Sequence, residues 1–470
     1  MMADTFDLEK EICEITDPKA LRVIVYLLER VRLLEEKVAA LSKDSSTSSK
    51  PPSSDIVKPL HEQRQPGKRK AGGQPRHPGV RRQMFKPEEI DRVEDVESFE
   101  CPECGGRLEE ARAEEVYIQQ MVELKEKPVE VVEYRQYGHL CEKCGKIHYQ
   151  PLPAEVIEGQ LCGPRLQALL GYLKGNLGAS YTELSQLCSD VFGTALSRGL
   201  ICRTIARVSE VLAVPYKELE QSLPEEKALN IDESGWKDSG HKYWVWVFCT
   251  QMIAYFTINR SRGCKVLEEV LGKTFKGGIV SDFFSAYVSY ATPLQQYCLA
   301  HLIRDIKFLT TLPDPEAKEF GEQLLKYFRR LFHYWHARDQ MGPELFRKKM
   351  DRLKRRLFTF LCSTEVPKGA SATMKKRLVK HWASLFRFVE HPELLQPTNN
   401  RSEQTLRHAI RVRRQTQGTR CEWGRQWSSR ILTVIGTCRK QDRSAWQFIY
   451  QAVMAHNFGT KIPSLIPQVI

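Results

Sequence analysis

The pattern of apolar and polar positions predicts a long helix near the N-terminus, because residues 24–41 repeat in a heptad. The two core positions hold Ile24, Val31 and Val38 in one case and Leu27, Leu34 and Leu41 in the other. β-Branched residues at the first position with leucine at the second favour two parallel strands. The pattern therefore predicts a coiled-coil helix and a homodimer or higher oligomer. The alternative is an amphipathic helix that packs on its own domain, since three heptads are near the lower limit of independent stability.

The segment that follows lacks apolar periodicity. Residues 42–59 are rich in serine, proline and lysine, a composition that cannot bury a core and is typical of a linker. Residues 61–86 contain eight Lys or Arg and one acid, interspersed with glycine and proline. We therefore place the coiled-coil helix in residues 1–44 and a basic flexible linker in 45–87. The basic part either tracks phosphates as an arm or is a solvated linker.

Residues 163–213 have helical spacing interrupted by glycines. Within Ser180–Ile205 the pattern predicts two short helices joined at Gly193–Ser197, the order of a helix-turn-helix. Such a motif would turn three arginines toward DNA: Arg198, Arg203 and Arg207. The alternative is an ordinary helical packing domain. We assign residues 156–223 to this helical domain.

After Pro224 the pattern changes to short strands rich in aromatic and β-branched residues. Strands are predicted at 228–231, 243–249, 253–259 and 278–281, with a helix at 264–272. This β-β-β-α-β order predicts an α/β core that starts in residues 224–304. The runs LLKYFRRLFHYW and FRKKMDRLKRRLFTFL are helical with basic faces, which either grip DNA or are solvated. We place a helical insertion in 305–395 and the C-terminal core helices in 396–470, so the chain is a multidomain α+β protein.

Charge narrows the class of partner. The chain of 470 residues contains 71 Lys and Arg against 58 Asp and Glu, a formal net charge of +13. This excess favours nucleic acid as the binding partner, although an acidic membrane surface would also attract a basic protein. The most apolar run, Tyr243–Ile258, is interrupted by Thr250 and Gln251, so we expect strands and no membrane span. The acidic N-terminus lacks the features of a signal peptide, which predicts a cytoplasmic, nucleoid-associated protein.

Four of the 14 cysteines form two CxxC pairs. The pairs are Cys101 with Cys104 and Cys141 with Cys144, each followed by a glycine that allows a tight turn. This pattern predicts a four-cysteine Zn²⁺ site in a module that covers residues 88–155. The 36 residues between the pairs predict a long hairpin around 114–137.

Two features leave the role of this zinc module open. His139 and His148 are rival ligands of the ion. Residues 88–134 hold 16 acids and 5 bases, so most of that surface would repel phosphates. DNA binding and a structural or protein-contacting role are therefore both retained.

Two carboxylates carry the candidate chemistry of the α/β core. Asp232 follows the first predicted strand and Asp282 ends the fourth, and neighbouring strand ends can bring two such side chains together. Oxygen ligands select Mg²⁺ or Mn²⁺, and a pair of these ions can cleave a phosphodiester. Glu233 is a rival ligand, but adjacent residues of a strand point to opposite faces.

This chemistry calls for a third carboxylate, and Glu403 is the candidate. The run Thr398–Gln404 starts a helix, with Asn399 or Asn400 as its cap, that could present Glu403 to the sheet. Residues 401–443 carry 11 Lys or Arg and 3 acids, so substrate phosphates could lie along them. The 121 residues from Asp282 to Glu403 exceed a minimal core, which supports the helical insertion.

Several motifs in this region resemble the catalytic region of insertion-sequence-66 family transposases. They are IDESGW, the SRG before a helix, GGIVSDFFSAY, CLAH and TNNRSEQTLR, in the same order and spacing. Upstream, SSKPPSSD, GGQP followed by HPG, and the paired CxxC resemble the linker and zinc region of that family. Arg76 stands where the family pattern usually has glycine, and it adds charge to the basic arm.

The resemblance implies an RNase H-like core with an Asp-Asp-Glu triad at Asp232, Asp282 and Glu403. It also implies a Cys-x-x-His element from Cys298 to His301. His301 would touch DNA or the metal-bound phosphate; the alternative is a pair buried in the core.

The residues and the resemblance together predict a DNA transposase. It would use Mg²⁺ or Mn²⁺ to cleave DNA at its element's ends and transfer the 3′-hydroxyl into target DNA. Accessory transposition proteins are possible partners. The alternatives are an RNase H-like nuclease without strand transfer and a non-catalytic DNA-binding regulator.

Overall fold

The computed structural model describes residues 15–41, 84–94, 100, 103–107, 118–126, 128–153, 156, 159–366 and 368–467. The chain divides into two compact units, of which the first holds residues 1–59, 134–189 and 194–470 and the second holds 60–133 and 190–193. The predicted linker and most of the predicted basic arm, including Arg76, lie outside the described residues.

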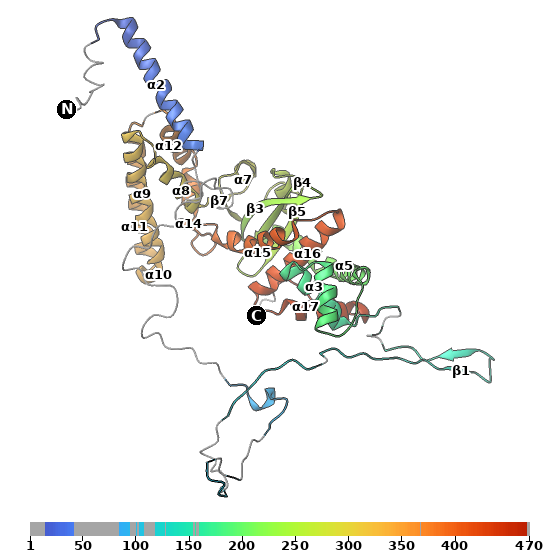
Figure 1. The fold of residues 1–470 in the computed structure, drawn as a ribbon. Helices are drawn as coiled ribbons and strands as arrows, with labels where there is room; N and C mark the ends of the chain where they lie inside the picture. The colour runs from blue at the N-terminus through green and yellow to red at the C-terminus, as the bar shows by residue number, and fades with distance from the viewer. Residues whose placement is uncertain are drawn as a thin grey trace, which may run out of the picture. The chain divides into compact units, whose positions relative to one another are not determined.

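A five-stranded mixed sheet forms the centre of the first unit (Figure 1). Its strands are β3 (Ala228–Asp238), β4 (His241–Cys249), β5 (Ala254–Asn259), β6 (Gly278–Ser281) and β7 (Leu294–Tyr297). The order across the sheet is β5-β4-β3-β6-β7, with β3, β4 and β5 antiparallel and β6 and β7 parallel to β3. The four predicted strands are confirmed, and helix α6 (Lys265–Leu271) lies where a helix was expected.

Strand β3 is longer than its apolar pattern predicted. The prediction ended it at Ile231, but the strand continues through the polar run to Asp238 and is paired with β4 from Asn230 to Asp238. A two-residue hairpin of Ser239 and Gly240, both with positive φ, joins the two strands. The prediction that Asp232 follows the strand is therefore wrong, because Asp232 lies within it.

Strand β7 was not predicted, because its sequence LQQY has two polar residues and no alternation. Both glutamines are buried. Gln296 donates to the carbonyl of Leu385 at 3.2 Å and accepts from the backbone N–H of Phe388 at 3.0 Å. The polar atoms of Gln296 are thus satisfied by residues about 90 positions away, which no local pattern shows.

A first group of helices packs beside the sheet through α5, α15 and α16, which contact β3, β4 and β5 (Figure 1). The group contains α3 (Pro164–Leu177), α4 (Tyr181–Asp190), α5 (Arg198–Ser222), α15 (Asn400–Thr416), α16 (Glu422–Lys440) and α17 (Ala445–Asn457). A 3₁₀ turn, η4 (Leu223–Glu225), leads from α5 into β3. Thr433 and Thr437 on α16 accept hydrogen bonds from β5 backbone N–H groups, at 2.9 and 3.0 Å. The prediction of two short helices within 180–205 is wrong for the second, since α5 has 25 residues.

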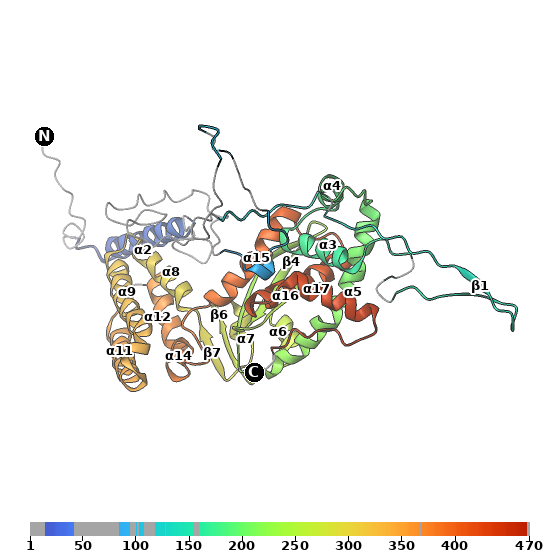
Figure 2. The same ribbon diagram turned by 90° about the horizontal axis from the view of Figure 1, so that it is seen from below.

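A second group of helices packs on β6 and β7 and shares one hydrophobic core with them. It contains α8 (Leu299–Leu309), α9 (Pro315–His336), α10 (Arg338–Met341), α11 (Pro343–Ser363), α12 (Ala370–Lys380), α13 (Trp382–Leu385) and α14 (Arg387–Glu390). Figure 2 shows the sheet between this group and the helices α3, α5 and α17. A short helix, α7 (Ser285–Ser289), follows β6.

The predicted N-terminal helix is α2 (Pro18–Leu41). Arg32 on α2 pairs with Asp314 at 2.9 Å and donates to the carbonyl of Lys368, and Ala39 packs against the core of the second group. The heptad residues Leu27, Val31 and Leu34 are each at least half exposed. Within the described residues, no helix is both long and apolar enough to cross a bilayer.

Around the second CxxC pair, β1 (Gly138–Leu140) and β2 (Ile147–Tyr149) form a short antiparallel hairpin. The hairpin expected around 114–137 is not found in its described part, residues 118–126 and 128–137, which contain no strand. The second unit has one 3₁₀ turn, η2 (Pro87–Glu89), among its described residues.

Candidate active site and metal centres

Strands β3 and β6 bring the two candidate aspartates to neighbouring positions in the sheet. The strands run parallel with Asn230 opposite Val280, and two residues beyond that pair are Asp232 and Asp282. Asp232 accepts a hydrogen bond from the backbone N–H of Glu233, and Asp282 accepts one from Phe284, both at 2.9 Å. Each carboxylate is thereby oriented by its own chain segment.

Negative charge accumulates around Asp232. Burial raises the pKa of its carboxyl well above the ordinary range, and the neighbouring Glu233, Asp282 and Glu403 raise it further. Groups that repel each other in a buried place favour a bound cation, because the cation offsets both the burial and the repulsion.

Helix α15 begins next to Asp232 because Asn399 holds it there. The expected role of Asn399 was a side-chain cap, but its side chain makes no cap hydrogen bond and is buried. Its Nδ2 donates to the carbonyl of Ile231 at 2.7 Å, and its Oδ1 accepts from Asn230 at 3.0 Å. Since Glu403 lies one turn after Asn399, this pair of bonds sets the distance of Glu403 from β3.

Cys298 joins the same helix to β6 and α8. Its backbone N–H donates to the carbonyl of Ser281 at 2.7 Å, and its Sγ accepts from the N–H of Asn399 at 3.1 Å. Burial raises the pKa of the Cys298 thiol to about 11, so it is a neutral thiol at pH 7. The chain segments that precede Asp282, His301 and Glu403 are thus linked through one residue, Cys298.

His301 and Glu403 face each other at this junction. The His301 Nδ1 lies 3.7 Å from the Glu403 Oε1, and their side chains are 14% and 25% exposed. Both atoms are buried and have no hydrogen-bond partner among the described residues. The two side chains and the Cys298 Sγ lie within 4.8 Å of one another, which makes them a candidate metal site.

The oxygens of Asp232, Asp282 and Glu403 do not all lie within 4.8 Å of one another in the described residues. In a two-ion site the ions are about 3.5–4 Å apart, so carboxylates that bind different ions need not lie close to one another. Oxygen donors, crowded negative charge around Asp232 and unpartnered atoms on Glu403 and His301 fit a divalent cation. These residues therefore fit Mg²⁺ or Mn²⁺ as ligands.

Glu233, the rival ligand, is engaged elsewhere. Its Oε1 accepts from the Nε and Nη2 of Arg262, each at 2.9 Å, and its Oε2 accepts from the Tyr287 hydroxyl. Arg262 stacks over Trp244 at 4.3 Å and Phe284 at 3.9 Å. Arg262 and Tyr287 were missed as site residues, although the SRG and SAY motifs contain them.

The second CxxC pair forms a separate candidate metal site. Cys141, Cys144 and His148 have ligand atoms within 4.8 Å of one another, and the Cys144 Sγ lies 3.5 Å from the His148 Nε2. The pKa of the Cys141 thiol is lowered, chiefly by hydrogen bonds from Cys144. Gly145 has a φ of +66°, which confirms the tight turn after the pair.

The first CxxC pair cannot be placed with the second. Cys101 lies outside the described residues, and Cys104 is an exposed residue of the second unit. The structure therefore groups His148, a rival ligand in the sequence analysis, with the second pair. His139 pairs with His148 across the hairpin but is not part of the candidate site.

Most bases of the C-terminal segment 401–443 are engaged within the protein. Eight of the 11 donate hydrogen bonds to other parts of the chain, and these are Arg401, Arg411, Arg413, Arg425, Arg430, Arg439, Lys440 and Arg443. Three make no such bond within the described residues: Arg407, Arg414 and Arg420. The charge that predicted a phosphate-binding segment is therefore largely used to hold the fold together.

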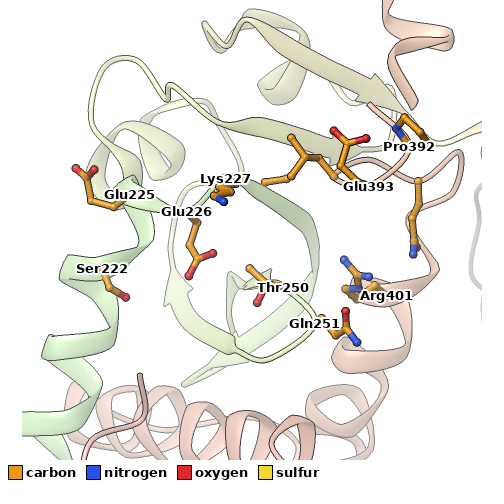
Figure 3. A pocket seen from close by; sticks show the side chains of 12 residues that line it. Ser222, Glu225, Glu226, Lys227, Thr250, Gln251, Pro392, Glu393 and Arg401 are labelled. Atoms are coloured by element: carbon orange, nitrogen blue, oxygen red, sulfur yellow. The ribbon is translucent and has the colours of Figure 1, made fainter. Parts of the chain in front are cut away.

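A pocket of about 490 Å³ opens beside Ala228, the first residue of β3 (Figure 3). It is lined by Glu226, Lys227, Thr250, Glu393 and Arg401 among others. Asp232 lies four residues along β3 from Ala228 at the pocket wall, about 13 Å away at the usual rise of a strand. The pocket is therefore separate from the carboxylate site, and its mixed charges indicate no ligand class.

Comparison with known families gives two matches. A family model described as "Transposase IS66 family" matches residues 159–426, more than half of the chain. A second, described as a family of unknown function (DUF6444), matches residues 8–83. No curated protein matches the chain. The first match includes all four residues of the candidate active site: Asp232, Asp282, His301 and Glu403.

Proposed function

The chain belongs to the IS66 family of transposases, and from this premise we propose that it cleaves DNA at the ends of its element and joins the freed 3′-hydroxyl to target DNA. The observation that carries the proposal is the linked arrangement around Cys298 and Asn399. It brings β3, β6, α8 and α15 together and with them Asp232, Asp282, His301 and Glu403.

We propose that Asp232, Asp282 and Glu403 hold Mg²⁺ or Mn²⁺. Such ions, when bound, activate a water or a 3′-hydroxyl and stabilise the leaving oxygen of the phosphodiester. The protein's own part is to hold the carboxylates in position, and the bound cation would offset the burial and the mutual repulsion that raise the pKa of Asp232. Arg262 and Tyr287 occupy both oxygens of Glu233, so Glu233 does not compete with Asp232 for the cation.

In the same proposal His301 is a positioning residue or a phosphate contact. Its Nδ1 faces the Glu403 Oε1 and no other described partner, so it restricts the rotamers of Glu403. A core pair of Cys298 and His301 remains the alternative. Substitution of His301 by asparagine would then change stability and leave the metal concentration needed for activity unchanged.

Removal of one carboxylate tests the catalytic assignment. Asp232→Asn and Glu403→Gln should lower strand cleavage and strand transfer by on the order of 10³-fold, because each removes a charge needed at the cation. Purified protein with Mg²⁺ and a duplex that carries the element end provides the assay. Glu319→Gln, an exposed acid on α9, is the matched control and should retain wild-type activity. Activity of Asp232→Asn equal to that control would overturn the assignment.

The same assay separates the alternative functions. A pre-cleaved element end should be joined to plasmid DNA by the wild-type protein. Cleavage without any joined product would favour a nuclease without strand transfer. Specific DNA binding without either product, unchanged in Asp232→Asn, would favour a DNA-binding regulator.

We also propose that Cys101, Cys104, Cys141 and Cys144 bind one Zn²⁺, with His148 as the alternative fourth ligand. Support comes from the grouping of Cys141, Cys144 and His148 and from the lowered pKa of the Cys141 thiol. Metal analysis should find about one zinc per chain, and Cys141→Ser should lose it. Zinc loss in Cys101→Ser but not in His148→Ala would favour four cysteines, and the reverse would favour the histidine.

For assembly we propose a homodimer or higher oligomer through α2. Polar residues of this helix face the rest of the unit, while Leu27, Val31 and Leu34 are exposed in heptad register. Leu27→Glu with Leu34→Glu should convert the protein to a monomer in light scattering. An unchanged mass would show that another surface forms the oligomer.

A further inference from the structure

We propose that a groove between α9 and α11 binds the phosphate backbone of duplex DNA, an inference that rests on the proposed transposase function. The groove has a volume of about 280 Å³. It is lined by Arg330, Tyr334, Leu345, Lys348, Lys349, Arg352, Leu353 and Arg356. Five of these residues are cations and none is an acid.

The charge of the groove is not neutralised by the protein. Within the described residues, Arg330, Arg352 and Arg356 have no hydrogen bond or ion pair. Lys348 pairs with Glu344 at 2.8 Å, but both side chains are more than 70% exposed, so the pair is weak. Helix α11 carries seven Lys or Arg and two acids in total. The five cations of the groove, whose lining holds no carboxylate, repel one another, and a polyanion would offset that cost.

The row of cations on α11 is long enough to reach several phosphates of one DNA strand. Lys348, Arg352 and Arg356 are four residues apart and therefore lie on one face of α11. They span about 12 Å along the helix at 1.5 Å per residue. One strand of a duplex carries a phosphate about every 3.4 Å along its axis, so this row faces about three or four successive phosphates. Arg330 and Lys349 line the same groove and would contact them from its side.

The helices of the groove share one hydrophobic core with the helix that carries His301. Helix α8 carries His301 in its first turn and packs Leu302, Ile306 and Leu309 into the core that α9 and α11 share. Trp335 on α9 also contacts Phe388 on α14, with ring centroids 5.2 Å apart. Figures 1 and 2 both show α9 and α11 side by side. A duplex held in this groove would keep a fixed position relative to the carboxylates.

The favoured occupant is DNA and not an acidic protein segment. Arginines make up three of the five cations, and their planar guanidinium groups suit phosphate oxygens. The apolar part of the groove is small, because Leu353 is buried and Leu345 is the one exposed aliphatic residue that lines it. A protein partner would require a larger apolar contact to stay bound.

Salt dependence of DNA binding by the full chain tests the groove. We compare Arg330→Gln/Arg352→Gln/Arg356→Gln with a matched triple from the same helices, Lys326→Gln/Arg329→Gln/Arg347→Gln, whose residues do not line the groove. The probe is a labelled duplex, and the readout is the slope of log K against log salt concentration. The groove triple should reduce the slope by about 2 to 3, at about 0.9 per phosphate contact, and the matched triple by less than 1.

The outcomes distinguish this inference from the proposed function. Equal slopes for the two triple variants would contradict DNA binding by the groove. Strand cleavage by the wild type would still support the proposed function. If the groove triple variant loses polyglutamate binding but keeps its DNA binding, the groove binds an acidic protein, and the inference is wrong. Absence of cleavage and joining by the wild type would instead contradict the proposed function. If the groove triple fails to fold, Arg352→Gln alone should reduce the slope by about 0.9 against Arg347→Gln.

Discussion

Two regions of the chain are strongly basic, and they use their charge in different ways. In the C-terminal segment 401–443, eight of 11 bases donate hydrogen bonds to residues elsewhere in the fold. On α9 and α11, Arg330, Arg352 and Arg356 make no hydrogen bond or ion pair within the described residues. The first region would therefore respond to substitution through stability, and the second through ligand binding.

The difference between them comes from partners distant in the sequence. Arg425 pairs with Asp238, 187 positions away, and Arg413 donates to Ser234, 179 positions away. Among the described residues, Arg352 and Arg356 on the groove face of α11 have no such partners. A count of charges treats both regions alike, so only the fold separates bases that hold the protein together from bases that are free to bind phosphate.

The largest expected difference between the two regions is in stability. Arg425→Gln leaves Asp238, which is 7% exposed, without its ion pair and should lower the free energy of unfolding by about 3 kcal/mol. Arg352→Gln removes an exposed charge and should change it by less than about 0.5 kcal/mol. Urea denaturation followed by circular dichroism measures both. Equal losses would show that the two basic regions do not differ as described.

A smaller effect is expected from pH, through His408. Burial lowers its pKa from 6.5 to about 4, helped by repulsion from Arg439, while its ring contacts the Asn176 carbonyl at 3.2 Å. The unfolded chain takes up a proton near pH 6.5, before the folded protein does. Stability that is full above pH 6.5 is therefore lost progressively as the pH falls to about 4.

This loss can be measured against a variant that cannot titrate. Between pH 7.5 and 5.0 the wild type should lose about 2 kcal/mol more than His408→Gln. The groove has no buried histidine of this kind, so Arg352→Gln should keep the wild-type pH dependence. Parallel pH profiles of wild type and His408→Gln would contradict a neutral, buried His408.

Apolar patterning was sufficient for the strands that have it. Short runs of aromatic and β-branched residues predicted β4, β5 and β6, because each of these strands contains a run of buried apolar residues. The same reasoning ended β3 at Ile231 and missed β7, because there the buried positions are polar. Asn230 and Gln296 are satisfied by side-chain or backbone groups of distant helices, and such partners leave no local periodicity.

The candidate site shows the same limit. Carboxylates that follow apolar strands indicated Asp232 and Asp282, because a short strand and a metal ligand are both local features. The residues that connect the site were not predicted as connectors. Asn399 was expected to cap α15 but bonds to β3, and Cys298 joins Ser281 to Asn399. Their roles depend on contacts across about 100 to 170 positions.

The smallest expected effect is that of one groove charge on DNA binding, and it distinguishes most directly between the two basic regions. Arg352→Gln should reduce the slope of log K against log salt concentration by about 0.9, with little change in stability. Arg414→Gln removes a base of the C-terminal segment that makes no hydrogen bond within the described residues, and it serves as the counterpart. If Arg414→Gln reduces the slope as much as Arg352→Gln does, DNA also contacts the C-terminal segment. In that case the presence of free bases, rather than the groove itself, decides where the phosphates bind.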